Sequence, residues 1–303
     1  PRERQHAGDV RVAAADDVQL VHALRIALRD TLRGIDPATL ATLDPGSDAS
    51  AIALWGRLAD VAAVTGSDDA AWFALTAVRR HDLGPEVTAR ALLGVAERCG
   101  PERVDEAVAF ARGSSPADRP FRALVEGWQR RGKALDRGTA LGQWAEAISG
   151  ETLAAAAADG PNGEPQQLLV SLAVARQLGL TGLGDPVATV LADQRFSDEA
   201  RIAAAETLLA LDAPQGITAA GALVADGRVA SGVRKGVAER LGSLRSVAAA
   251  TALVHALATA PEWLEQPVAL AAAATPEGAA LLVDSIAAGK ASARILQQPA
   301  VVE

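Results

Sequence analysis

The feature that most constrains the fold is an internal repeat, in which residues 201–225 align with residues 234–258. The matched pairs are Arg201 and Arg234, Ala205 and Ala238, Glu206 and Glu239, Leu208 and Leu241, Leu211 and Leu244, Thr218 and Thr251, and Ala219 and Ala252. These pairs lie 33 residues apart and fall at helical spacing, so we expect each unit to be a helix, a short turn and a second helix. Such a unit cannot cover its own apolar face, and stacking against neighbouring units covers it.

Two further similarities extend the repetition beyond this pair of units. The pentapeptide Gly-Val-Ala-Glu-Arg occurs at residues 94–98 and again at residues 236–240. Pro-Gln-Gly at residues 214–216 corresponds to Pro-Glu-Gly at residues 276–278, two repeats later. Chance similarity in an Ala-rich chain is the alternative explanation for the pentapeptide, whereas the 33-residue alignment is harder to attribute to chance.

The composition favours helices that pack closely against one another. Hydrophobic residues make up 50% of the chain and aromatic residues only 3%, so small aliphatic side chains dominate. Gly and Pro separate stretches of helical periodicity, and no stretch shows the alternation of a strand, so we predict an all-α protein. We expect helices at residues 17–33, 49–64, 67–81, 86–99, 102–112, 118–131, 139–158, 166–178, 186–192, 198–211, 215–225, 229–241, 246–258 and 276–288.

The repeat length favours one kind of helical architecture. The period is near that of TPR and ankyrin repeats and somewhat below that of HEAT repeats, but the chain has neither the TPR nor the ankyrin signature. We therefore predict an α-solenoid of stacked helical hairpins with HEAT-like or armadillo-like repeats. A Gly- and Pro-rich stretch predicts a linker at residues 159–165, between an N-terminal helical repeat region at 1–158 and a C-terminal HEAT-like repeat region at 166–303.

The residue chemistry gives little support for catalysis or for a bound metal. The chain has one Cys and four His without metal-ligand spacing, and it lacks a Gly-x-Ser-x-Gly motif. A net charge of −8 argues against nucleic acid or anionic lipid as a partner, and no apolar stretch approaches the roughly 20 residues of a membrane span. We predict no catalytic, cofactor-binding or metal-binding residue and no cofactor in this segment, which we expect not to be an enzyme.

Several residues that could suggest a site are expected to be structural. Cys99 lies in the last turn of an expected helix, where a lone Cys usually packs as a small apolar residue. Gly179, Gly182 and Gly184 follow a helix, so we expect a helix end and a turn instead of a phosphate loop. Packing between helices is also expected of the five tryptophans, Trp55, Trp72, Trp128, Trp144 and Trp263.

The most distinctive polar feature is a ladder of basic residues along one side of the first expected helix. It consists of His22, Arg25, Arg29 and Arg33, which could bind an acidic partner, a carboxylate ligand or a phosphate. The alternative is a solvated face whose arginines pair with Asp30 and Asp36, and this alternative is favoured. A second basic cluster, Arg130, Arg131, Lys133 and Arg137, lies at a helix end, where cations are favourable in any case.

Two segments resemble a known family. One is the sequence His-Ala-Leu-Arg-Ile-Ala-Leu-Arg-Asp at residues 22–30, and the other is residues 287–301, from Ala-Ala-Gly-Lys to Gln-Gln-Pro-Ala-Val. Both segments are similar to stretches of large planctomycete-type secreted proteins. In that family a β-propeller dehydrogenase-like domain precedes a HEAT-like helical region, and a cytochrome c domain follows it. The resemblance covers this chain as the helical region alone, and it implies a periplasmic or cell-envelope location with haem chemistry in a neighbouring domain.

The chain departs from the full family pattern because it has no Cys-x-x-Cys-His sequence. Covalent haem attachment is therefore not expected here, and no active-site residue of the family can be assigned. The chain starts at Pro1 and contains no Met, so we expect either an excised segment of a longer protein or a sequence that has lost its methionines.

These observations lead to two functional hypotheses. The first is a non-catalytic helical-repeat scaffold or protein-interaction module, which spaces the domains of a larger secreted redox protein. Its partners would be neighbouring domains or a protein in the concave groove that the inner helices form. The alternative is a helical ligand-binding or enzymatic domain that uses the arginine ladder to bind an anionic ligand.

Overall fold

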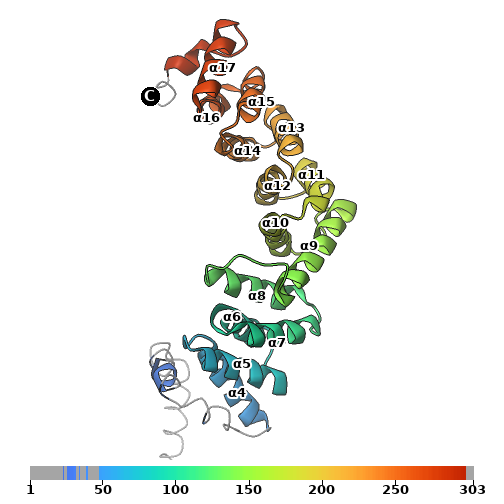
Figure 1. Ribbon diagram of the computed structural model, residues 1–303, viewed down its shortest axis with the longest axis vertical. Coiled ribbons are helices and arrows are strands. Elements are labelled where there is room, and N and C mark those ends of the chain that lie inside the picture. The colour runs from blue at the N-terminus through green and yellow to red at the C-terminus, as the bar shows by residue number, and fades with distance from the viewer. Residues whose placement is uncertain (1–22, 24–25, 32–33, 35–38, 40–47, 298–303) are drawn as a thin grey trace, which may run out of the picture. The chain divides into compact units, whose positions relative to one another are not determined.

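A computed structural model describes residues 23, 26–31, 34, 39 and 48–297 of the chain (Figure 1). Within these residues the chain is helical and contains no strand, which confirms the all-α prediction. The chain divides into two compact units, Pro1–Trp144 and Ala145–Glu303. The stretch predicted as a linker, residues 159–165, connects two helices inside the second unit.

Between residues 48 and 297 the helix boundaries agree with the sequence expectations to within about two residues, apart from one helix discussed below. The bounds of the helix expected at residues 17–33 lie outside the described residues. The first unit contains α4 (Ala49–Ala63), α5 (Asp68–Arg80), α6 (Pro85–Arg98), α7 (Pro101–Arg112) and α8 (Asp118–Arg130). The division between the units falls within α9 (Ala140–Asp159). The second unit contains α10 (Pro165–Leu178), η1 (Thr181–Leu183), α11 (Gly184–Ala192), α12 (Asp198–Leu211), α13 (Ala213–Ala225), α14 (Ser231–Ser243), α15 (Val247–Leu257), α16 (Glu262–Ala272), α17 (Pro276–Ala287) and η2 (Ala293–Gln297).

Local signals in the sequence set the helix ends. Ser197 and Ser246 each accept a hydrogen bond at the start of a helix, from the backbone N–H of Ala200 and Ala249 respectively, and so satisfy a donor that the helix itself leaves free. Gly179 ends α10 in the left-handed region at φ 61° and ψ 49°. The Gly-rich stretch after α10 is thus a helix end followed by a turn, as predicted.

The helices of the second unit form two layers, as Figure 1 shows. Consecutive members of the set α10, α12, α14 and α16, called here the even layer, contact one another. The same holds for α11, α13, α15 and α17, the odd layer. Helices α10, α12 and α14 begin at Pro165, Asp198 and Ser231, a spacing of 33 residues at each step. The spacing found in the sequence therefore reappears as the spacing of helices in one layer.

The first unit has the same spacing between alternate helices. Helix α6 begins at Pro85 and α8 at Asp118, again 33 residues apart, and these two helices contact each other. Their close approach depends on Gly127, where an added Cβ atom would lie 2.3 Å from the carbonyl oxygen of Leu93. Any side chain at this position would have to push α8 away from α6.

Small aliphatic side chains fill the core of both units. In the first unit Trp55 stacks on Phe73 with ring centroids 5.6 Å apart, and Trp55, Trp128 and Trp144 are buried. The prediction that every tryptophan packs between helices is wrong for Trp263, whose side chain is 52% exposed on α16. Packing in the core therefore does not explain the presence of Trp263 on α16.

Helix α16 is the element that the sequence did not predict. It contains Pro267 in its interior, and a Pro there removes the backbone N–H that would bond to the carbonyl four residues earlier. The helix persists because Leu264, Val268, Ala269 and Ala272 are buried against its neighbours, α14 and α15. Tertiary packing thus outweighs the local preference of proline.

Candidate binding groove between α14 and α16

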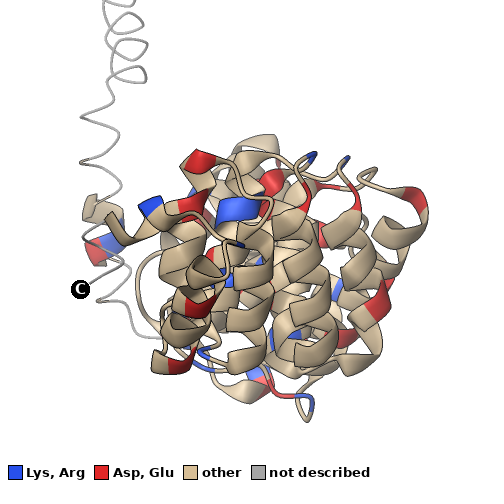
Figure 2. Ribbon diagram, turned by 90° about the horizontal axis from the view of Figure 1, so that it is seen from above, with Lys and Arg blue, Asp and Glu red and all other residues tan. Residues whose placement is uncertain are grey.

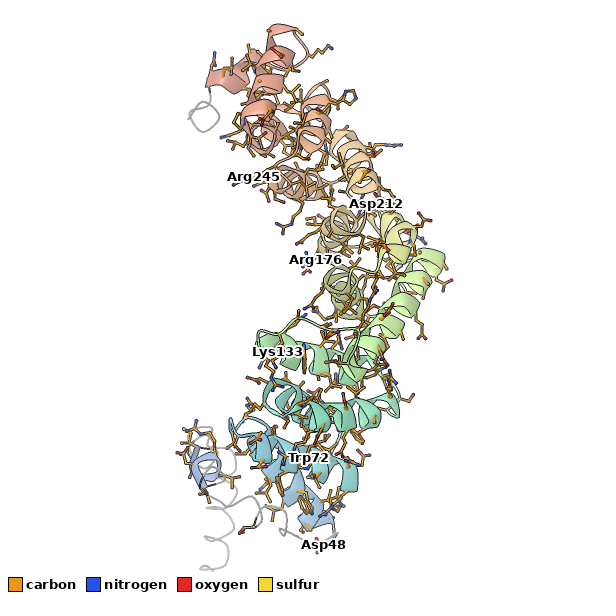
Figure 3. All side chains as sticks on the ribbon, viewed as in Figure 1. Asp48, Trp72, Lys133, Arg176, Asp212 and Arg245 are labelled. Atoms are coloured by element: carbon orange, nitrogen blue, oxygen red, sulfur yellow. The ribbon has the colours of Figure 1, made fainter. Side chains whose placement is uncertain are left out.

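A groove of about 620 Å³ runs between α14 and α16 in the even layer. Its lining is Lys235, Glu239, Gly242, Ser243 and Arg245 from α14 and the turn after it, and Gln266, Pro267, Leu270, Ala271 and Ala274 from α16 and its end. In Figure 3, Arg245 and Arg176 both lie on the side of the second unit that the even layer forms. The groove is thus open along the face of this layer.

The groove exists because the two helices approach closely and carry small side chains where they meet. An added Cβ atom at Gly242 would lie 2.8 Å from the Cβ atom and 2.9 Å from the Cα atom of Ala271. The buried side chains below this contact, among them Leu241 and Leu264, keep the two helices together. Above the contact, the longer side chains of Lys235 and Leu270 stand at the walls of the groove.

Two cations of the groove have no partner among the residues that the structure describes. Lys235 and Arg245 are exposed, and neither side chain forms an ion pair or a hydrogen bond within that part of the chain. Glu239 lies between them along α14 and is exposed in the same way. Unpaired cations beside a groove are free to bind an incoming carboxylate without first losing an internal partner.

Arg245 also has an unusual backbone. Its φ is 48°, in the left-handed region, and it is the one non-glycine residue with positive φ among those described. Its N–H donates to the carbonyl oxygen of Gly242 at 3.2 Å, which closes the end of α14. A side chain in this region costs about 1 kcal/mol relative to glycine. An arginine therefore occupies a position where glycine would fit better.

The opposite wall of the groove is apolar and partly exposed. Pro267, Leu270, Ala271 and Ala274 of α16 and its end form this wall. Trp263 is not part of the lining but lies on the same stripe of α16, since Trp263, Pro267 and Leu270 follow the spacing i, i+4 and i+7. Trp263 and Leu270 are 52% and 38% exposed. The groove therefore combines an apolar wall from α16 with a charged wall from α14.

Next to the groove, the even layer carries a chain of ion pairs. Glu206 of α12 pairs with Arg176 of α10 and also lies 3.5 Å from Nε of Arg240 on α14. All three side chains are about 40–50% exposed, so these pairs contribute little to stability and leave the charges available to solvent. Figure 2 shows basic and acidic residues at scattered positions on the described helices.

The arginine ladder predicted in the first helix is only partly described. Arg29 forms an ion pair with its neighbour Asp30 at 2.9 Å, as in the alternative in which the arginines pair with local acids. His22, Arg25 and Arg33 lie outside the described residues. The ladder as a binding site therefore stays a prediction.

In the second basic cluster, two arginines are occupied by structural contacts. Arg130 pairs with Glu126 at 2.6 Å, and Arg131 donates to the carbonyl oxygen of Cys99 at 2.6 Å while its guanidinium lies over the ring of Trp128. Arg131 thereby ties the end of α8 to the end of α6. These contacts agree with a structural role for this helix end.

Cys99 is a packing residue, as expected from its sequence position. It is fully buried, and its Sγ donates to the carbonyl oxygen of Asp68 at 3.3 Å. Burial raises the pKa of the thiol above its ordinary value, although the nearby Arg103 acts in the opposite direction. A buried thiol with a raised pKa is a poor nucleophile.

Within the described part of the chain, no group of three or more His, Cys, Asp or Glu side chains could hold a metal ion. The helices there include none that is both long and apolar enough to span a membrane.

Comparison with known proteins finds no matching family model, no matching curated protein and no matching solved structure. The groove must therefore be interpreted from its own residues.

Proposed function

We propose that the protein is a non-catalytic α-solenoid of HEAT-like helical hairpins, and that the even layer of its second unit is a protein-binding surface. The observation that carries the proposal is the groove between α14 and α16, which joins an exposed apolar wall to two unpaired cations. Protein-binding surfaces combine apolar anchors with charged groups around them, and Arg is frequent among their strongest contacts.

The regular spacing of the helices supports the architectural part of the proposal. Within the second unit the starts of α10, α12 and α14 are 33 residues apart, and each helix of a layer contacts its counterpart in the next hairpin. The same backbone contact also recurs at this spacing, since Arg201 and Arg234 donate to the carbonyl oxygens of Leu191 and Val224. Solenoid repeats bury their apolar faces through such neighbour contacts and present a continuous surface of one helix layer.

The resemblance to planctomycete-type secreted proteins suggests the setting of this surface. We propose that the helical region spaces a dehydrogenase-like domain from a cytochrome c domain, in the periplasm or cell envelope. The segments that carry the resemblance are residues 22–30 and 287–301. In this setting the occupant of the even layer would be a neighbouring domain of the same protein or a separate partner.

Site-specific photo-crosslinking in the producing cells tests the proposed surface. A photoreactive amino acid replaces Ser243 in the groove, and in the control it replaces Thr251, which is exposed on α15 of the odd layer. We expect a discrete protein adduct, or a link to a neighbouring domain, from position 243 and none from position 251. Equal labelling from both positions, or no adduct from either, would overturn the proposed binding surface.

A further inference from the structure

We propose that the groove between α14 and α16 binds an extended acidic peptide segment, with two carboxylates at Lys235 and Arg245 and an apolar side chain against Leu270. This inference rests on the proposed function, since it names the occupant of the same surface. Three properties of the groove carry it: the spacing of its cations, the position of Glu239 between them and the apolar stripe opposite.

The spacing of the two cations sets the spacing of the acidic residues. Lys235 lies on α14, which ends eight residues later at Ser243, about 12 Å further along the helix axis at 1.5 Å per residue, and Arg245 lies in the turn just after this end. An extended peptide advances about 3.3 Å per residue, so about four or five residues reach from the level of Lys235 to this turn. A peptide with acidic residues at this separation can reach both cations at once.

The middle of the groove selects against a third acidic residue. Glu239 lies between Lys235 and Arg245 on α14, and its carboxylate would repel another carboxylate placed there. Leu270 and Pro267 line the groove from α16 and favour an apolar side chain. The preferred peptide therefore has an acidic residue at each end and an apolar residue between them, instead of a run of acids.

The same features disfavour a nucleic acid in this groove. A nucleic acid carries a phosphate at every nucleotide, so some phosphates would lie beside Glu239. The chain as a whole has a net charge of −8, which weakens its attraction for a polyanion. Two separated cations beside an apolar stripe instead match a peptide of mixed character.

The backbone of Arg245 gives a reason to assign it a binding role. Its left-handed conformation at φ 48° would suit glycine better, and its side chain has no partner among the described residues. An unpaired cation at a backbone position that disfavours a side chain agrees with a role in binding.

Fluorescence anisotropy with a synthetic peptide tests the inference on the full chain. The probe is the fluorescein-labelled decapeptide GSDSLSGDSG, and the comparison peptides carry Lys in place of both Asp residues or have both Asp residues adjacent. We expect weak, salt-sensitive binding of the probe, with a dissociation constant of about 10 µM to 1 mM at low salt, and at least about tenfold weaker binding of both comparison peptides.

Variants then separate binding from folding. Lys235→Gln combined with Arg245→Gly removes both cations, and the glycine relieves the backbone of residue 245, so the thermal unfolding midpoint should stay the same or rise. This double variant should bind the probe about tenfold more weakly, whereas the control Lys290→Gln, which removes an exposed cation outside the groove, should bind it as the original chain does. Glu239→Gln should bind the probe at least as tightly as the original chain and should bind the adjacent-Asp peptide more tightly than the original chain does.

Three results would overturn the inference. They are an unchanged affinity in the double variant, equal binding of the Lys peptide, and no detectable binding of the probe up to about 1 mM. Equal competition by an oligothymidylate would also overturn it, in favour of a general anion site. A discrete crosslink from position 243 together with any of these results would leave the protein-binding surface standing and reject only the acidic peptide as its occupant.

Discussion

The Nε atom of Arg234 donates a hydrogen bond of 2.7 Å to the carbonyl oxygen of Val224, in the last turn of α13. One period earlier, Arg201 makes the same contact at 3.0 Å to Leu191, in the last turn of α11. Carbonyl groups at a helix C-terminus lack an intrahelical donor and carry partial negative charge, so a buried guanidinium is favourable there. Each arginine thereby fastens an even-layer helix to the end of the preceding odd-layer helix.

Replacing Arg234 by Ala should destabilise the second unit. The side chain is 2% exposed, and its loss would leave a buried carbonyl oxygen without its donor as well as a cavity. We expect the free energy of unfolding to fall by about 2–4 kcal/mol, measured by urea denaturation. The control Lys235→Ala, at an exposed position on the same helix, should change it by less than about 0.5 kcal/mol. Equal effects of the two variants would show that the buried contact does not stabilise the fold.

Deletion of one whole period should leave a folded protein if the second unit is built from equivalent repeats. Removing residues 198–230 takes out α12 and α13 and joins Ser197 to Ser231, so that α14 follows α11. Arg234 would then stand in the place of Arg201 and donate to the carbonyl oxygen of Leu191. We expect a cooperative unfolding transition and a helical circular dichroism spectrum in proportion to the shorter chain.

The control for this deletion removes half a period. Deleting residues 198–211 takes out α12 alone, which would bring an odd-layer helix into the even layer and expose its apolar face. This variant should lose cooperative unfolding. Similar behaviour of both deletions would contradict a stack of equivalent hairpins.

The sequence revealed the repeat but not the role of its best-matched residues. Arg201 and Arg234 aligned at the 33-residue offset, yet an arginine within a helical pattern is usually exposed, so their burial could not be predicted. A matched charged residue is not by itself a signal of burial, because Glu206 and Glu239 also match at this offset and are not buried. Helix boundaries, in contrast, followed from Ser caps, Pro and Gly, which act locally and are visible in the sequence.

The groove could not be predicted because one of its walls was missing from the expected structure. Pro267 obscured α16, whose stability comes from packing against α14 and α15 and not from local preference. Without α16 the exposed stripe of Trp263 and Leu270 had no helix to lie on. The left-handed backbone of Arg245 follows from the way α14 ends in three dimensions, and the sequence there contains no glycine to signal it.

The turn between α13 and α14 gives a pH-dependent contribution to stability. The side chain and the backbone N–H of Arg228 donate to Asp226 and hold the pKa of its carboxyl at about 2, compared with an ordinary value of 3.8. Because the pKa is lower in the folded state, the carboxylate stabilises the fold above pH 3.8, and this contribution is lost as the pH falls towards 2.

Asp226→Asn should therefore be less stable than the original chain at pH 7, and the difference should shrink between pH 4 and pH 2. Urea denaturation at these pH values measures the difference, and a carboxyl titration by NMR should place the pKa of Asp226 near 2. The control Asp284→Asn removes one exposed carboxylate elsewhere in the second unit. A stability difference that does not change with pH would contradict the role of the Asp226 carboxylate.

Gly242 should be essential for the contact between α14 and α16, and thus for the shape of the groove. A methyl group at this position would lie within 3.0 Å of the Cβ, Cα and carbonyl oxygen atoms of Ala271, and backbone atoms cannot move aside as a flexible side chain could. Gly242→Ala should therefore lower the free energy of unfolding by about 1–3 kcal/mol, even though Ala favours a helix more than Gly does. Gly150→Ala is the matched control, because Gly150 also lies inside a helix, α9, nothing lies within 4 Å of an added Cβ atom there and its φ is not positive. The clash would force α14 and α16 apart, so Gly242→Ala should also weaken binding of the acidic peptide. If the Gly242→Ala protein were instead more stable than the original chain, the two helices would not meet at this glycine.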